Sequence, residues 1–347
     1  MKQRGFSLVE LMVALTLSLV LMSGVLSIFF SSKVTYLSNE KTARLQESGR
    51  TALDLIVHDV RGSGYPGCIK PAPVVSPFMS SLNTPTAPLW NFGVPVQGYE
   101  YVSSGTWSPT INFGAEVLDP APIDGSDVLA VRAVSRDAPA LVLQDDMAGG
   151  TDTLTVPNVL GSAIAAGQIM MVTDCFATAV FQVTGYTAGS PNGELAHTDA
   201  AGVPGNTSAN LGFAFAADAR VLPVETIVYY VADGADGGPS LYRKVGAADS
   251  EELIPGVQAL QVAYGEDTDS NRVVDRYVAA DSITDWMDVI SVSLSLLIRS
   301  EESGTEVDEA TYTLLPVAAG GETVGPFDDR RQRMLFTTSA AIRNRAL

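Results

Sequence analysis

Cysteine and histidine are scarce in this chain of 347 residues, which has two of each. Zinc sites draw on closely spaced pairs such as Cys-x-x-Cys, and the sequence has no such pair. It also lacks the His-Glu-x-x-His, Gly-x-Ser-x-Gly and P-loop motifs that mark common hydrolases and nucleotide-binding enzymes. We therefore expect a protein that is not an enzyme.

Positive charge is also in short supply, with 21 lysines and arginines against 39 acidic residues and a net charge of −18. A nucleic-acid-binding surface needs a basic stripe, and docking on anionic lipid headgroups needs a basic cluster. The composition therefore argues against nucleic-acid binding and against docking on anionic lipid headgroups. Any attachment to a membrane must then come from an apolar segment.

Only one such segment occurs. Residues 6–30 run without a charge except for Glu10, and at ~1.5 Å per residue they are long enough to cross a ~30 Å hydrocarbon core. Lys2 and Arg4 precede this segment, and the positive-inside rule keeps them in the cytoplasm. We expect one membrane pass with the rest of the chain outside the inner membrane. A carboxylate at position 10 costs roughly 2.5–3.5 kcal/mol there, so Glu10 needs a partner.

The run RGFSLVELMVAL (residues 4–15) resembles the class III signal of type IV pilins and type II secretion pseudopilins. The resemblance implies that prepilin peptidase removes residues 1–5 by cutting between Gly5 and Phe6, and that the new amino group of Phe6 is N-methylated. It also implies that Glu10 attracts the N-terminal amine of a neighbouring subunit and sets its axial register. An ordinary secretory signal ends in a small-x-small site, and none follows Phe30.

The helix is expected to continue beyond the membrane segment, over residues 31–61. Apolar or small residues recur there at steps of three and four, which lays a stripe on one face of a helix. They are Leu45, Gly49, Leu53, Ile56 and Val60. Gly62, Gly64 and Pro66 end the pattern.

The remainder predicts a β-rich head. Residues 62–126 are proline-rich, which favours a long connection with short edge strands. Residues 127–347 contain about ten short β-branched runs, including a hairpin formed by 225–232 and 240–245, and a Gly/Ala/Asn-rich loop at about 187–212. The fold class is therefore α+β and pilin-like, with one long N-terminal helix packed on a large, strand-rich antiparallel β head domain.

Three segments, residues 47–68, 225–244 and 330–345, resemble PilW-type minor pilins, whereas residues 69–220 match no family. The resemblance implies a low-abundance subunit of a type IV pilus that primes assembly and sits in the tip complex. Its implied partners are other minor pilins, the major pilin, prepilin peptidase, the inner-membrane assembly platform and a large tip adhesin. Two alternatives stay open: a minor pseudopilin of type II secretion, and an adhesin whose head binds a surface ligand.

An acidic turn follows the strand that ends near residue 265. Asp267, Asp269, Asn271 and Asp275 stand at positions 1, 3, 5 and 9 of a Ca²⁺ loop, with the carbonyl of Val273 at position 7. Arg272 occupies the usual glycine position, and Val278 the position of the bidentate glutamate. Glu266 or Asp281 would have to replace that ligand. The alternative is a solvated acidic turn without a metal.

Cys68 and Cys175 would lie in an oxidising compartment, where a disulfide between them or two separate buried thiols are both expected states. His58 is expected at a helix–sheet contact and His197 in solvent. The aromatic residues of the proline-rich region are expected in the core or as loop anchors, with a recognition surface as the alternative. They are Trp90, Tyr99, Tyr101 and Trp107.

Overall fold

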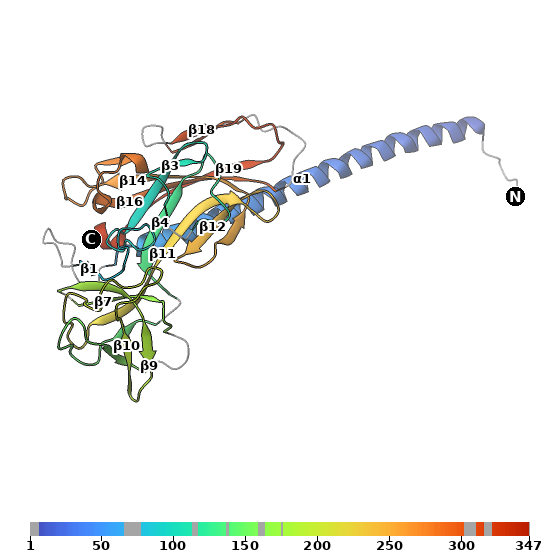
Figure 1. Ribbon diagram of the computed structural model, residues 1–347. Coiled ribbons are helices and arrows are strands. Elements are labelled where there is room, and N and C mark those ends of the chain that lie inside the picture. Colours follow the sequence, from blue (N-terminus) through green and yellow to red (C-terminus); the bar gives the residue numbers. More distant parts are fainter. Residues whose placement is uncertain are drawn as a thin grey trace. The chain divides into compact units, whose positions relative to one another are not determined.

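The computed structural model describes residues 7–65, 78–112, 117–136, 139–158, 164–174, 176–301, 310–315 and 321–346 (Figure 1). The chain forms two compact units, Met1–Glu47 and Ser48–Leu347. The second, called the head unit below, holds every strand that the structure describes.

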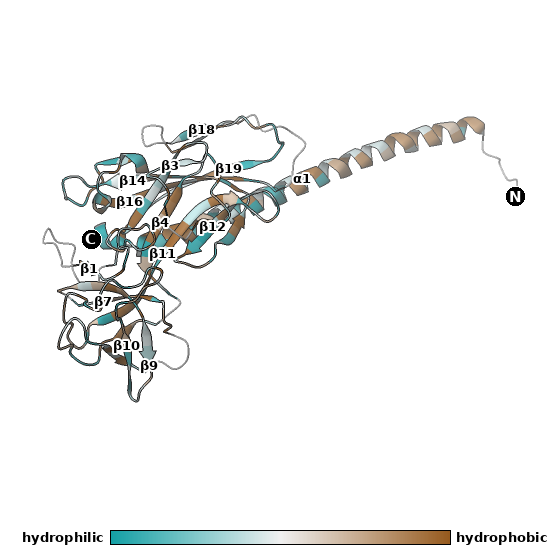
Figure 2. Ribbon diagram, in the orientation of Figure 1, coloured by the Kyte–Doolittle hydropathy of each residue, from teal (hydrophilic) through white to brown (hydrophobic). Residues whose placement is uncertain are grey.

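A single helix, α1 (Leu8–Gly62), runs for 55 residues and confirms the expected long N-terminal helix. Its first half is apolar along its length (Figure 2), and the large apolar side chains from Leu8 to Phe30 are exposed. By length and composition, this is the one helix among the described residues able to cross a membrane.

The last turns of α1 belong to the head unit and pack through one face. Ala52, Ile56 and Val60 are fully buried, and Leu53 and Val57 are nearly so. The predicted stripe is thus correct at Leu53, Ile56 and Val60. Each buried Leu, Ile or Val side chain on this face contributes roughly 1.5–3 kcal/mol.

The main sheet of the head unit has ten strands, which are antiparallel except where β1 pairs with β8. Its central path is β1 (Phe78–Ser80), β8 (Thr178–Gln182), β7 (Ile169–Thr173), β11 (Arg220–Asp233), β4 (Val128–Val134), β2 (Val96–Ser103) and β3 (Thr106–Ser108). Also joined to β11 are β5 (Leu141–Val142) and β12 (Pro239–Val245), and β12 carries β13 (Glu251–Pro255).

Three smaller sheets complete the unit. A four-stranded sheet has the order β15 (Arg276–Val278), β14 (Val257–Glu266), β16 (Val289–Arg299) and β19 (Arg333–Ala341). A three-stranded sheet has the order β6 (Leu154–Pro157), β10 (Asn192–Ala196) and β9 (Gly185–Thr187), and a pair is formed by β17 (Tyr312–Leu314) and β18 (Glu322–Val324). Three short helices remain: η1 (Ala280–Ser282), η2 (Trp286–Asp288) and α2 (Arg343–Ala346).

The predicted hairpin is confirmed by β11 and β12, which pair from Ile227↔Val245 to Asp233↔Pro239. The head therefore has the expected α+β fold, with one helix packed on antiparallel strands.

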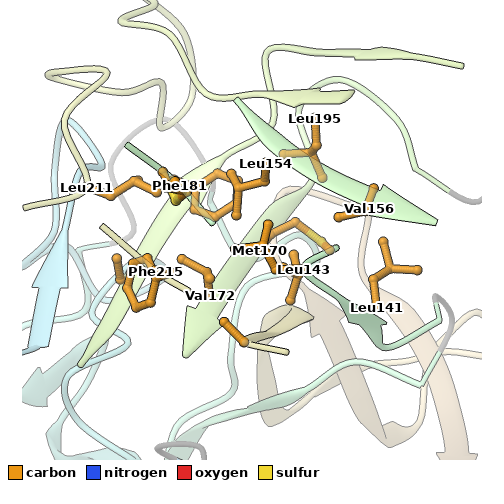
Figure 3. Close-up of a cluster of buried hydrophobic side chains, with 14 of the residues drawn as sticks. Leu141, Leu143, Leu154, Val156, Met170, Val172, Phe181, Leu195, Leu211 and Phe215 are labelled. Carbon is orange, nitrogen blue, oxygen red and sulfur yellow. The ribbon is translucent and has the colours of Figure 1, made fainter. Parts of the chain in front are cut away.

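Two cores share the strands β7 and β8. Side chains of β7 alternate between them: Ile169 and Met171 enter one core, and Met170 and Val172 enter the other. The second core lies between β7 and β8 on one side and β6 and β10 on the other, where Leu154, Val156 and Leu195 face Phe181 and Met170 (Figure 3). Because successive side chains of a strand point to opposite faces, a strand that separates two cores is apolar throughout.

Two expectations differ from the structure. Residues 96–103 were expected in the connection, but they form β2, which pairs with β4 inside the main sheet and buries Val96 and Tyr99. The loop expected at about 187–212 contains β10, whose Leu195 is fully buried. Long-range pairing with β6 orders this stretch, although its glycines and prolines favour a loop.

Candidate assembly and metal sites

The start of α1 carries the assembly residues predicted from the sequence. Gly5 and Phe6 lie outside the described residues, so the cleavage site stays a prediction. Glu10 lies in the first turn, where the Ser7 backbone N–H donates to its Oε2 at 3.1 Å, and the Val9 N–H donates to the Ser7 hydroxyl oxygen at 3.2 Å. This reciprocal arrangement is a capping box, which satisfies N–H groups that the helix cannot pair internally.

Apolar side chains surround this carboxylate on α1. Leu8, Val9, Leu11 and Met12 are all more than half exposed. An apolar surface of this length needs lipid or other helices to cover it. The capping box supplies one hydrogen bond to Glu10, yet leaves its negative charge without a cation among the described residues.

Near the end of α1, within the head unit, the buried carboxylate of Asp59 makes two side-chain contacts that the sequence pattern did not indicate. The Tyr229 hydroxyl donates to Asp59 Oδ2 at 2.6 Å, and an Arg136 N–H donates to Asp59 Oδ1 at 2.8 Å. Burial, followed by the negative charge of Asp59, raises the pKa of Tyr229 far above its ordinary value. The tyrosine therefore stays a donor at any physiological pH. The neighbouring His58 is exposed, rather than held at a helix–sheet contact.

The acidic turn brings three of its predicted ligands together. Carboxylate oxygens of Asp267, Asp269 and Asp275 lie within 4.8 Å of one another. Asp267 is buried and accepts from the backbone N–H groups of Asn271 at 3.0 Å and Arg272 at 2.8 Å. The Thr268 hydroxyl and N–H both donate to Asp275 Oδ2, and these two bonds lower the pKa of Asp275.

The backbone of this turn accommodates one of the two departures from the Ca²⁺ pattern, the arginine at the sixth position, but not the missing glutamate. Arg272 takes the left-handed conformation, with φ of 68°, that glycine usually supplies at the sixth position. Val278 lies in β15, where it pairs with Tyr264, and its apolar side chain has no oxygen to offer a cation. Glu266 is engaged with Arg276 at 2.8 Å, and neither it nor Asp281 belongs to the carboxylate group. Of the five predicted ligands, the three carboxylates lie together, and the Asn271 amide and the Val273 carbonyl stay predictions.

A second acidic feature lies in the core and was missed because its members are far apart in sequence. Asp127 accepts from the N–H groups of Tyr101 at 3.0 Å and Val262 at 2.9 Å, which links the main sheet to β14. Glu100 Oε2 and Tyr264 Oη are buried without a hydrogen-bond partner among the described residues. Burial, then the charge of Asp127, raises the pKa of Glu100 to about 9, and burial raises the pKa of Asp127 to about 7.

The remaining candidates are placed as follows. Cys68 and Cys175 lie outside the described residues, so the disulfide stays a prediction. His197 was expected in solvent, but it is buried against Phe181 and its Nε2 lies 2.7 Å from the carbonyl oxygen of Asp152. Among the aromatic residues, Trp90 and Tyr99 are core residues, and Tyr101 and Trp107 make an edge-to-face pair.

Comparisons with known proteins bear on both ends of the chain. Residues 228–344 match the family model of PilW, described as Type IV Pilus-assembly protein W, and residues 1–26 match the prokaryotic N-terminal methylation motif. A solved structure, the Type IV-like pilin TTHA1219 from Thermus thermophilus, aligns with a TM-score of 0.31 and 12% identity over 88% of this chain and 98% of that one. No curated protein matches the sequence.

Proposed function

We propose that this chain, which matches the PilW family model over residues 228–344 and the N-terminal methylation motif over residues 1–26, serves as a minor pilin that primes pilus assembly and remains in the tip complex. It would be held in the inner membrane by the first half of α1, with its head in the periplasm, until it enters the fibre. The observation that carries the proposal is a single carboxylate, Glu10, on an exposed apolar helix that continues into the head.

The physical argument concerns the charge of Glu10. An isolated carboxylate in lipid is expensive, and a cation of a neighbouring subunit offsets much of that cost. The amine of a processed Phe6 would be such a cation. The small residues Ala14, Ser18 and Gly24 allow neighbouring helices to approach closely. Together these features favour bundling of α1 with the corresponding helices of other subunits.

We predict that Glu10→Ala leaves processing and membrane insertion intact but removes the subunit from sheared fibres. The measurement is immunoblotting of membrane and sheared fractions, together with pilus counts by electron microscopy. Glu47→Ala, which removes an exposed carboxylate from the same helix, should enter fibres normally. Wild-type pilus numbers and recovery for Glu10→Ala would contradict the proposed role of this residue.

Glu10→Gln separates charge from helix capping. Glutamine can accept the same bond from the Ser7 N–H, because capping boxes use either residue. If attraction to an amine drives docking, Glu10→Gln should fail as Glu10→Ala does. Normal incorporation of Glu10→Gln would instead assign the effect of Glu10→Ala to the loss of the capping box.

A further inference from the structure

A groove of about 620 Å³ opens on the head unit where the end of α1, β4, the start of β11 and α2 come together. Arg61, Arg136, Arg220 and Arg343 line it, and we name it the arginine groove. All four arginines are exposed. Four of the 21 basic residues of a chain with a net charge of −18 therefore gather at one place.

Within the described part of the chain, few carboxylates offset the positive charge of the arginine groove. Asp59 is the one carboxylate among the described residues that line it, and its two oxygens are engaged by Tyr229 and Arg136. Among the described residues, no carboxylate pairs with Arg61, Arg220 or Arg343. Three guanidinium groups thus have their donors available to a ligand.

Guanidinium groups favour a particular kind of ligand. Their planar fork matches a carboxylate with two parallel hydrogen bonds. Arg136 already binds a carboxylate in the groove, through one contact with Asp59 at 2.8 Å. The volume falls within the range of about 300–1,000 Å³ that is usual for ligand clefts. The groove also has an apolar wall, formed by Tyr65, Val134 and Leu222. The CH₂ groups of a bound acidic side chain, or of a side chain next to it in the ligand, can pack against this wall.

The net negative charge of the chain favours a short anionic ligand over a long one in this groove. Charges act over about 8–10 Å at physiological salt, so a short acidic segment inside the groove experiences mainly the arginines. A nucleic acid or another long polyanion would extend over the surrounding surface of a protein with a net charge of −18 and be repelled by it. The groove is therefore suited to a local cluster of carboxylates.

We propose that the arginine groove docks a short Asp/Glu-rich segment of another protein. The arginines come from four separate parts of the chain, so the groove exists only in the folded head. The inference does not depend on the role of Glu10 in pilus assembly, because the groove and α1 before residue 48 are in different units.

The test uses the full chain purified in a nonionic detergent and a rhodamine-labelled oligoglutamate peptide as the probe, followed by fluorescence anisotropy. Wild-type protein should bind this peptide and not the matching oligoglutamine peptide. Raising the salt from about 50 mM to about 300 mM should weaken binding, since charge–charge attraction is screened. Equal binding of both peptides, or no effect of salt, would overturn the proposal.

Paired variants locate the binding. Arg220→Gln/Arg343→Gln removes two positive charges from the groove. Arg61 is kept, because its positive charge in the last turn of α1 interacts favourably with the helix dipole. Binding should become at least about tenfold weaker, the loss expected for two charge-assisted contacts. Arg50→Gln/Arg330→Gln changes the net charge equally at exposed positions outside the groove and should bind like the wild type.

Thermal melting of the variants and a competing oligonucleotide probe complete the design. Both double variants should melt at the wild-type temperature, because the substituted side chains are exposed. Equal weakening in both variants would assign binding to net charge and overturn the groove as its site. Tighter binding of a single-stranded oligonucleotide of the same charge, lost in the groove variant, would replace the acidic segment with a nucleic acid.

Discussion

At the scale of single residues, the head keeps two carboxyl groups in places where ionisation is unfavourable. Glu100 and Asp127 are both buried, and each has a pKa raised above its ordinary value of 4.5 or 3.8. The folded state therefore holds protons that the unfolded chain releases at lower pH. Linkage then requires the contribution of these two groups to the free energy of unfolding to fall as pH rises from about 4 through about 9.

We predict that Glu100→Gln flattens this pH dependence and raises the melting temperature at about pH 9, because glutamine cannot ionise. The measurement is thermal unfolding of the wild type and the variant across this pH range. Glu194→Gln, at an exposed position on β10, should reproduce the wild-type profile. A wild-type stability that rises with pH over this interval would contradict the prediction.

At the scale of elements, α1 approaches β19 through a glycine. A Cβ on Gly49 would overlap the ring of Phe336, whereas Gly24 on the same helix has open space around it within the chain. Glycine in a helix interior costs about 1 kcal/mol relative to alanine. Glycine at position 49 therefore lowers helix propensity but allows α1 to pack closely against the ring of Phe336.

We predict that Gly49→Ala lowers the free energy of unfolding of the head by about 1 kcal/mol, the excess of an overpacking cost of about 1–3 kcal/mol over the propensity gain. Chemical denaturation measures it. Gly24→Ala should not destabilise the head, and Gly49→Ala/Phe336→Leu should recover part of the loss by making room. Higher stability for Gly49→Ala alone would show that the contact is not tight.

The acidic turn between β14 and β15 gives a second test at this scale. Extracellular Ca²⁺ sites have Kd values of about 0.1–1 mM, so about 10 mM calcium would stabilise a bound state by about 1.4–2.7 kcal/mol. We predict a rise in melting temperature with calcium that Asp269→Ala abolishes and that Asp249→Asn, at an exposed position elsewhere, retains. An unchanged melting temperature in calcium would leave a solvated acidic turn.

At the scale of the whole molecule, one chain joins an apolar helix to a head with a net negative charge and a local basic groove. We predict that deleting its gene reduces the number of surface pili, because a priming subunit acts before the fibre grows. Electron microscopy counts the pili, and an assay of secreted proteins tests the pseudopilin alternative. Normal numbers of pili that fail to adhere would favour an adhesin instead.

Local periodicity made much of this fold predictable. The steps of three and four at Leu53, Ile56 and Val60 correctly place the buried face of α1, and the flanks of the Asp233–Pro239 turn correctly give the β11–β12 hairpin. The acidic turn at Asp267–Asp275 is also predictable from the sequence, because its carboxylates are close together along the chain. These features depend on neighbours a few residues away.

The apolar helix, the isolated Glu10 near its start and the strand-rich character of the head follow from the sequence alone, because each depends on a continuous run of residues or on a short repeat. The proximity of Glu100 to Asp127, the burial of His197 and the gathering of four distant arginines at one groove are visible only in the folded chain. Such contacts depend on strand order and register, which are set by the packing of the entire core rather than by any local pattern.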